Sequence, residues 1–340
     1  MVKHPFESVQ LKAYLSSIDQ NFDGENIKDS LILACNDVRQ ILPAALYDKL
    51  IASITTPPVD PVTDPPSDPP TTNLADASKD AVELLRFAMA PLAFYRAFIW
   101  LQLRVSNNSI TTYKSTDETT AFGYQVAEAK ENLLLRYAAF MRELIDFLNS
   151  KEDLFTDWKD SDQRKELNEL LIKDYRDFDN YFLTDGDAAF FYRARVIMKE
   201  AQDEDIVPMV GKISVLLKPA APAELDANKI RQVKKALAYL TVSRALFDWD
   251  EFYLPATLRR MLSQDSGKTS GNNNGSRSGK TEPPVSDKER LSAKYRNKAI
   301  SILQSIDVQQ EADKAEKDYP DEAISIKSVA IDKSDKHYFM

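Results

Sequence analysis

The sequence predicts an all-α protein that contains two related helical modules. Apolar residues recur at three- and four-residue steps through most of the 340 residues, as one face of a helix requires. The chain has only 8 glycines, which is few for an α/β fold, whose tight turns depend on glycine. Helices, proline-rich segments and polar loops follow the same order in both halves, and this order predicts the repeat.

The first module is expected to span residues 1–150. Residues 55–72 hold seven prolines, which remove backbone donors, so this run is predicted to be an extended linker. Pro91 is expected to kink the longest helix of the module. A polar loop is expected at residues 106–120. A short helix or turn is expected at residues 42–54. The other helices of the module are expected at residues 6–18, 27–41, 75–105 and 122–149.

A charged helical connector at residues 151–176 is expected to lead into a second module at residues 177–310. Within this module, residues 264–284 are rich in Gly, Asn, Ser and Lys and are predicted to form a low-complexity loop. Residues 311–340 read as a charged C-terminal tail, with one weakly alternating stretch that suggests a strand at 323–331. The helices of the second module are expected at residues 188–202, 228–249, 251–262 and 288–306.

An internal duplication is the simplest account of the shared order. Residues 88–97 align with residues 236–245, and residues 133–145 align with residues 291–303. The alternative is that any two amphipathic helices match this well, and it stays open at this point. Identical pairs in the first alignment are Ala88 and Ala236, Ala90 and Ala238, Leu92 and Leu240, Arg96 and Arg244, and Ala97 and Ala245.

Four residues are predicted to act as structural or interface anchors. Arg96 and Arg244 lie in apolar stretches, where a guanidinium needs a carboxylate or carbonyl partner. Each arginine therefore either pins its helix to a neighbour or anchors an interface. Trp100 and Trp249 stand in dense aromatic surroundings and are explained by core packing or by interface contacts, where Trp and Arg concentrate binding energy.

No catalytic, cofactor-binding or metal-binding residues are predicted. The two histidines, His4 and His337, stand at the chain ends, which removes histidine acid–base chemistry from the interior. Cys35, the only cysteine, lies on the apolar face of its helix and is expected in the core. Asp185 or Asp187 is expected to cap the helix that follows it.

Two partial motifs are interpreted as coincidental. Residues 19–24 match the start of a calcium-binding EF-hand loop, but its twelfth position is Ser30 instead of the bidentate glutamate. Residues 275–281 resemble a phosphate-binding loop, but only three residues separate the two glycines where that motif has four.

Charge and hydropathy exclude two classes of partner. The net charge is −9, which disfavours nucleic-acid binding because that binding depends on Lys and Arg replacing counterions. No stretch reaches the roughly 18 apolar residues of a membrane helix. We expect no specific nucleic-acid binding and no membrane contact.

Several segments resemble known families. Residues 9–15 (VQLKAYL) and 32–37 (ILACND), separated by a polar turn, resemble the start of head–tail connector (head-completion) proteins of tailed phages. The rest is similar to an uncharacterised helical family of Bacteroidota phages and prophages. Its Pro-containing pattern before the linker is matched by residues 41–47 (ILPAALY) and by residues 207–211 (VPMVG), and residues 238–241 (AYLT) are also typical. The first copy lacks the glycine of this pattern.

The resemblance implies a structural virion protein, a neck adaptor that acts through oligomeric contacts. The implied partners are further copies of the chain and portal, tail or neck proteins. The implied location is the virion, with the host cytoplasm during assembly. Two other functions stay open: a bacterial helical adaptor or scaffold unrelated to phage, and a metal-dependent or carboxylate-only enzyme. The genes next to this one would separate phage from bacterial adaptor, and the metal content of the purified protein would test the enzyme.

Overall fold

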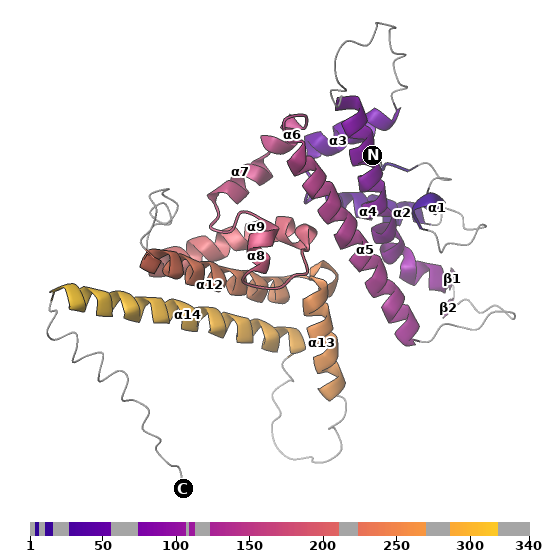
Figure 1. The fold of residues 1–340 in the computed structure, drawn as a ribbon. Coiled ribbons are helices and arrows are strands. Elements are labelled where there is room, and N and C mark those ends of the chain that lie inside the picture. The colour runs from indigo at the N-terminus through magenta and orange to yellow at the C-terminus, as the bar shows by residue number, and fades with distance from the viewer. Residues whose placement is uncertain are drawn as a thin grey trace, which may run out of the picture. The chain divides into compact units, whose positions relative to one another are not determined.

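The fold is all-α, as the sequence predicts. The structure is a computed structural model, and it describes residues 4–6, 11–15, 27–55, 74–106, 109–112, 123–210, 224–269 and 286–318. Helices make up nearly all of the elements in these ranges (Figure 1). The one sheet within them is an antiparallel hairpin of β1 (Leu103–Ser106) and β2 (Ser109–Thr112), with Leu103 opposite Thr112.

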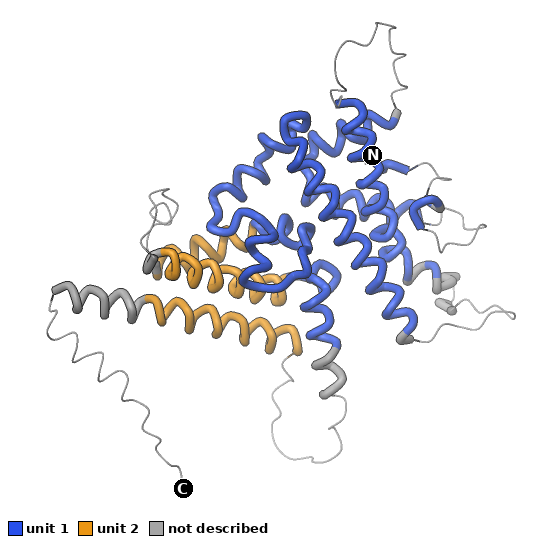
Figure 2. The backbone as a smooth tube through the Cα atoms, viewed as in Figure 1, with its two compact units in different colours: residues 1–195, 249–274 blue, residues 196–248, 275–340 orange. Residues whose placement is uncertain are grey.

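The chain divides into two compact units, and both are discontinuous in sequence (Figure 2). Unit 1 comprises residues 1–195 and 249–274, and unit 2 comprises residues 196–248 and 275–340. The sequence predicts contiguous modules instead. Compact units group residues by contact and a duplication groups them by ancestry, so the predicted module boundaries stay a prediction.

Helix α4 (Leu74–Gln102) is the centre of unit 1 and packs most extensively against four other helices of its described part. Its buried face is rich in alanine, including Ala88 and Ala93, both fully buried. Small side chains let neighbouring helices approach closely, and the larger apolar residues fill the space between them. The four neighbours are α1 (Leu11–Tyr14), α2 (Lys28–Arg39), α3 (Ala44–Thr55) and α5 (Gly123–Ser150).

Helices α4 and α5 run antiparallel. The ring of Phe87 stacks on Phe140 with centroids 5.0 Å apart, and Lys130 lies 5.3 Å from the ring of Phe98. Helix α4 stays continuous through Pro91, which is buried. It ends three residues before the predicted boundary, because residues 103–106 pair as β1.

The predicted connector is helical but broken into short helices: α6 (Thr156–Lys159), α7 (Asp162–Glu169) and α8 (Tyr175–Asp179). Polar caps explain the breaks. Ser161 Oγ accepts from the Arg164 amide at 3.3 Å, and Asp174 Oδ1 accepts from the Arg176 amide at 2.7 Å. Each cap satisfies an amide at a helix start and so fixes a new helix there. Trp158, fully buried, anchors the segment.

A tight loop precedes helix α9 (Ala188–Ala201). Asp179 accepts hydrogen bonds from the amides of Thr184 (2.8 Å) and Gly186 (2.7 Å). Asp185 and Gly186 both have positive φ, 59° and 70°. Asp187 Oδ1 accepts from the Phe190 amide at 2.8 Å. The predicted capping of this helix is therefore confirmed, with Asp187 as the cap.

The remaining part of unit 1 is η3 (Glu251–Tyr253), a short 3₁₀ helix, followed by α13 (Ala256–Thr269). The sequence predicts one helix at residues 251–262. Leu254 separates the two helices instead, because it is extended (φ −80°, ψ 148°).

Unit 2 is built on an antiparallel helix pair, α12 (Glu224–Asp248) and α14 (Asp287–Asp318), which lie side by side in Figure 1. Ser243 and Ser292 join them, since each hydroxyl donates to the other's carbonyl at 2.8 Å and both residues are buried. The last residues of α9 (196–201), the π-helix η2 (Gln202–Ile206) and α10 (Val207–Val210) also belong to unit 2.

Several predicted segments lie outside the described residues. These are most of the proline-rich linker (56–73), most of the low-complexity loop (270–285) and the tail that includes the predicted strand (319–340). Among the helices of the described ranges, none is long and apolar enough to cross a membrane.

Candidate functional site

Asp37 is the most buried charged group among the described residues, and it is the centre of a polar cluster in unit 1. Its side chain is 4% exposed. Arg96 donates to Asp37 Oδ2 from Nε at 3.0 Å and from Nη2 at 2.6 Å. Tyr253 donates its hydroxyl proton to Asp37 Oδ1 at 2.9 Å. Both carboxylate oxygens are therefore engaged.

Arg193 completes this group, which we call the Asp37 cluster (Asp37, Arg96, Arg193 and Tyr253). Arg193 Nη2 donates to the Asp37 backbone carbonyl at 3.4 Å, and its guanidinium lies 4.2 Å from the centre of the Tyr253 ring. The Arg96 guanidinium lies 4.4 Å from the ring of Phe252. Stacking on aromatic rings compensates both arginines for lost hydration.

The cluster joins segments that are far apart in sequence. Asp37 comes from α2, Arg96 from α4, Arg193 from α9 and Tyr253 from η3. The Tyr253–Asp37 hydrogen bond spans 216 residues. Burial and Asp37 raise the pKa of Tyr253, so its hydroxyl stays protonated and keeps donating. The arrangement holds η3 (Glu251–Tyr253) against α2, α4 and α9.

Tyr137, on α5, is buried beside this cluster without a hydrogen bond to its hydroxyl within the described residues. Burial raises its pKa to about 12, although the charge of Arg193 pulls in the opposite direction. A phenol with such a pKa is a neutral group at physiological pH. It does not supply a base to the cluster.

The second predicted arginine, Arg244 in unit 2, is also held by carboxylates. Its Nη2 donates to Glu204 Oε2 at 2.7 Å and to Asp205 Oδ2 at 2.8 Å, and Glu200 lies 3.7 Å from Nη1. Arg96 pairs with the helix that precedes the Leu42-Pro43 step, and Arg244 pairs with η2, which precedes the Val207-Pro208 step. Both arginines are 26% exposed. The structure places both as pins between helices.

Of the two tryptophans predicted as anchors, the structure describes the side chain of Trp249 but not that of Trp100. Trp249 is partly buried in unit 1, where its ring meets Phe190 edge to face at 5.8 Å and lies 6.5 Å from Tyr253. Trp100 lies near the end of α4, and its side chain is outside the described residues. The Asp37 cluster brings together Arg96 and, through Tyr253, Trp249, while Arg244 belongs to unit 2.

Cys35 is in the core, as the sequence predicts, and is fully buried. Burial raises the pKa of its thiol, which disfavours the thiolate that a nucleophile needs. Of the two histidines, His4 lies within the described residues and His337 lies outside them. The EF-hand-like residues 19–24 and the phosphate-loop-like residues 275–281 are also outside them.

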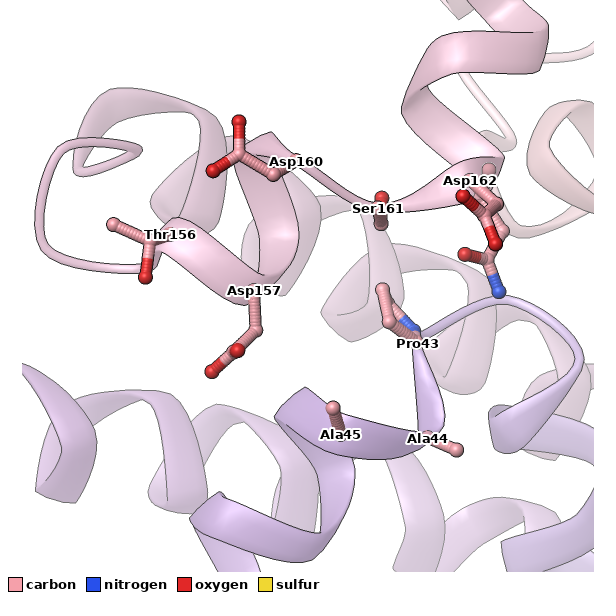
Figure 3. A pocket seen from close by; sticks show the side chains of 9 residues that line it. Pro43, Ala44, Ala45, Thr156, Asp157, Asp160, Ser161 and Asp162 are labelled. Carbon is pink, nitrogen blue, oxygen red and sulfur yellow. The ribbon is translucent and has the colours of Figure 1, made fainter.

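A hollow of about 440 Å³ in unit 1 carries acidic side chains (Figure 3). It lies between the start of α3 and the α6–α7 segment, and Figure 3 shows Asp157 extending from α6 toward the helix of Ala44 and Ala45. Asp157 pairs with Lys49, and Asp162 pairs with Lys165 at 3.4 Å. No group of three or more metal-ligating side chains suited to an ion occurs in the described ranges.

The sequence predicts Arg96 and Arg244 as anchors, but it does not single out Asp37, Arg193 or Tyr253. Asp37 was visible as a charge inside the apolar stripe of residues 27–41. One carboxylate and one arginine, each in an apolar stretch, predict an ion pair between them, because neither charge is stable when buried alone. Tyr253 and Arg193 gave no comparable signal, because both lie among other aromatic and charged residues.

Residues 38–168 are similar to a family described as "Family of unknown function (DUF6712)". The match covers less than half of the chain and includes α3, α4, α5 and Arg96, but it begins one residue after Asp37. Neither a curated protein nor a solved structure matches the chain.

Proposed function

We propose that this chain is a non-enzymatic helical assembly protein, a structural component of the head–tail connection of a tailed phage or prophage. The observation that supports the proposal is that the candidate arginines bind carboxylates within the protein. Arg96 and Arg244 are both engaged in ion pairs that hold helices together, and both oxygens of Asp37 are occupied. Polar groups in these positions stabilise the packing of the helices, and we assign the function to the exposed surfaces.

The duplication is a second part of the proposal, and burial supports it. Ala88, Ala90 and Leu92 are fully buried on α4, and their counterparts Ala236 and Ala238 are fully buried on α12, with Leu240 at 3% exposure. The partner helices agree as well, since α5 packs on α4 and α14 packs on α12. Tyr137 and its counterpart Tyr295 are 6% and 5% exposed.

The phage assignment rests on the resemblance of residues 9–15, 32–37 and 41–47 to head–tail connector proteins and related prophage proteins. Proposed partners are further copies of the chain together with portal, tail or neck proteins, and the proposed location is the virion. The net charge of −9 suits a protein beside passing DNA, because a basic wall would retain the DNA.

Co-expression with the products of neighbouring genes tests the proposal. We expect portal, capsid or terminase genes nearby, and we expect the tagged chain to co-purify with a portal or tail protein and to form particles visible by negative-stain microscopy. A protein that stays monomeric and binds none of these products would overturn it. Stoichiometric metal in the purified protein would instead favour the enzyme alternative.

A further inference from the structure

A second hollow, of about 350 Å³, lies in unit 2 between the end of α12 and the start of α14. Its apolar part comes from Leu240 and Phe247, and the buried Ser243–Ser292 pair lies at its base. The charged residues that line it are Arg244, Arg296, Glu204, Asp205 and Asp248.

Phe247 is the most exposed large apolar side chain of the described residues, at 69%. Its ring exposes apolar surface to water, and burial of that surface in a contact with another chain would be favourable. Single exposed apolar residues are common on protein surfaces. Phe247 differs from these because it stands at the edge of a hollow that contains opposite charges.

Two of those charges lack an ion-pair partner within the described part of the chain. Arg296 and Asp248 are both exposed and both line the hollow, yet neither makes a salt bridge there. Arg244, in contrast, is paired with Glu204 and Asp205. Counted over the described residues alone, the hollow presents one cation and one anion without an ion-pair partner, Arg296 and Asp248, beside the exposed ring of Phe247.

This combination identifies the kind of partner. A surface with charges of one sign selects a partner of the opposite sign, whereas two arginines and three acids line this hollow and nearly balance. In a two-fold contact the same patch meets itself, so Arg296 of one copy can face Asp248 of the other, and the reverse. A second copy of the chain supplies both complements at once.

We propose that two copies of the chain associate through this hollow, with Phe247 of each copy buried against the other. This inference rests on the proposed function and names the surface used for self-association. A stable interface buries roughly 1,000 Å² of surface, so the exposed faces of α12 and α14 beside the hollow also take part. Association should therefore depend on protein concentration.

The first test compares Phe247→Ala with wild type by sedimentation velocity of the full chain over a range of concentrations. We expect the dimer dissociation constant to rise by about tenfold or more, since aromatic anchors dominate such contacts. Leu183→Ala is the matched control, because Leu183 is 61% exposed but belongs to unit 1. Circular dichroism establishes that each variant is folded.

The second test is a charge exchange. Arg296→Asp and Asp248→Arg each place like charges opposite one another and should weaken association. The double variant restores opposite charges and should recover most of the wild-type affinity, which a merely destabilised protein would not do.

Three results overturn the inference. They are a wild type that stays monomeric at about 100 μM, well above a micromolar dissociation constant, a Phe247→Ala variant that associates like wild type, and a double variant that shows no recovery. The last two, in a chain that still binds a portal or tail protein, leave the proposed function intact. Failure of all partner binding as well removes the proposed function too.

Discussion

Replacing Arg96 by alanine leaves the Asp37 carboxylate, 4% exposed, without its cation. Breaking a buried pair in this way strands a charge, and we expect a loss of about 3 kcal/mol in the free energy of unfolding. Urea denaturation measures it. Lys165→Ala is the control, because the Lys165–Asp162 pair is exposed and should contribute no more than about 0.5 kcal/mol. Equal losses in the two variants would contradict the structural role of the pair.

Two tyrosines near the same carboxylate should respond differently to loss of the hydroxyl. Tyr253→Phe removes a hydrogen bond to a charged acceptor and should cost about 1.5 kcal/mol. Tyr137→Phe removes a buried hydroxyl that has no partner among the described residues, and should be neutral or stabilising. Thermal unfolding of the pair measures the contrast. The reverse order of stability would show that Tyr137, and not Tyr253, holds the cluster.

The Cys35 thiol should be unreactive in the native protein. It is fully buried and burial raises its pKa, so both access and thiolate content are low. A colorimetric thiol reagent should modify it only after denaturant is added. Because the chain has one cysteine, rapid labelling of the native protein would directly contradict the predicted position in the core.

At the scale of elements, the start of α9 gives a prediction with a pH dependence. Burial raises the pKa of Asp187 above its ordinary value of 3.8. The native state then binds more protons than the unfolded state between the two pKa values, so stability falls as pH rises through that window. Asp187→Asn keeps the cap and removes this loss, and should be at least as stable as wild type at pH 7.

Asp187→Ala is the matched variant, because it removes the carboxylate and the cap together. The lost hydrogen bond to the Phe190 amide should cost about 1 kcal/mol. Denaturant titrations at several pH values separate the two effects. An asparagine variant as unstable as the alanine variant would show that the charge, and not the cap, is what α9 requires.

Most helices could be predicted from the sequence, because their apolar periodicity is long and uninterrupted. The predicted helices at 27–41, 42–54 and 122–149 correspond closely to α2, α3 and α5. The predictions were less accurate where local polar groups compete with periodicity. Ser161 and Asp174 divide the connector, and residues 103–106 end α4 early as a strand.

The candidate site was only half predictable. An arginine in an apolar stretch needs a polar partner if it is buried, and this requirement singles out Arg96 and Arg244 in the sequence. The requirement does not identify the partner carboxylate. Asp37 and Tyr253, for example, are separated by 216 residues and come into contact only in the tertiary fold. Phe247 lies in the last turn of α12, and its exposure is likewise not predictable without the packing of α14.

At the scale of the whole molecule, the two units share one packing arrangement. A long helix rich in buried alanine packs against an antiparallel partner, and one arginine fastens it to the segment before it. This packing stabilises the helices whose exposed faces we propose as contact surfaces. We therefore expect the proposed function to depend on contacts with other chains.

The mass of the native particle tests this account most directly. Light scattering after size-exclusion chromatography should be carried out on the full chain, alone and mixed with candidate portal and tail proteins. We expect a mass above the 38.5 kDa of one chain that rises with concentration, and a further increase in the mixture. A constant mass of 38.5 kDa under both conditions would contradict the central claim that the protein acts by assembly.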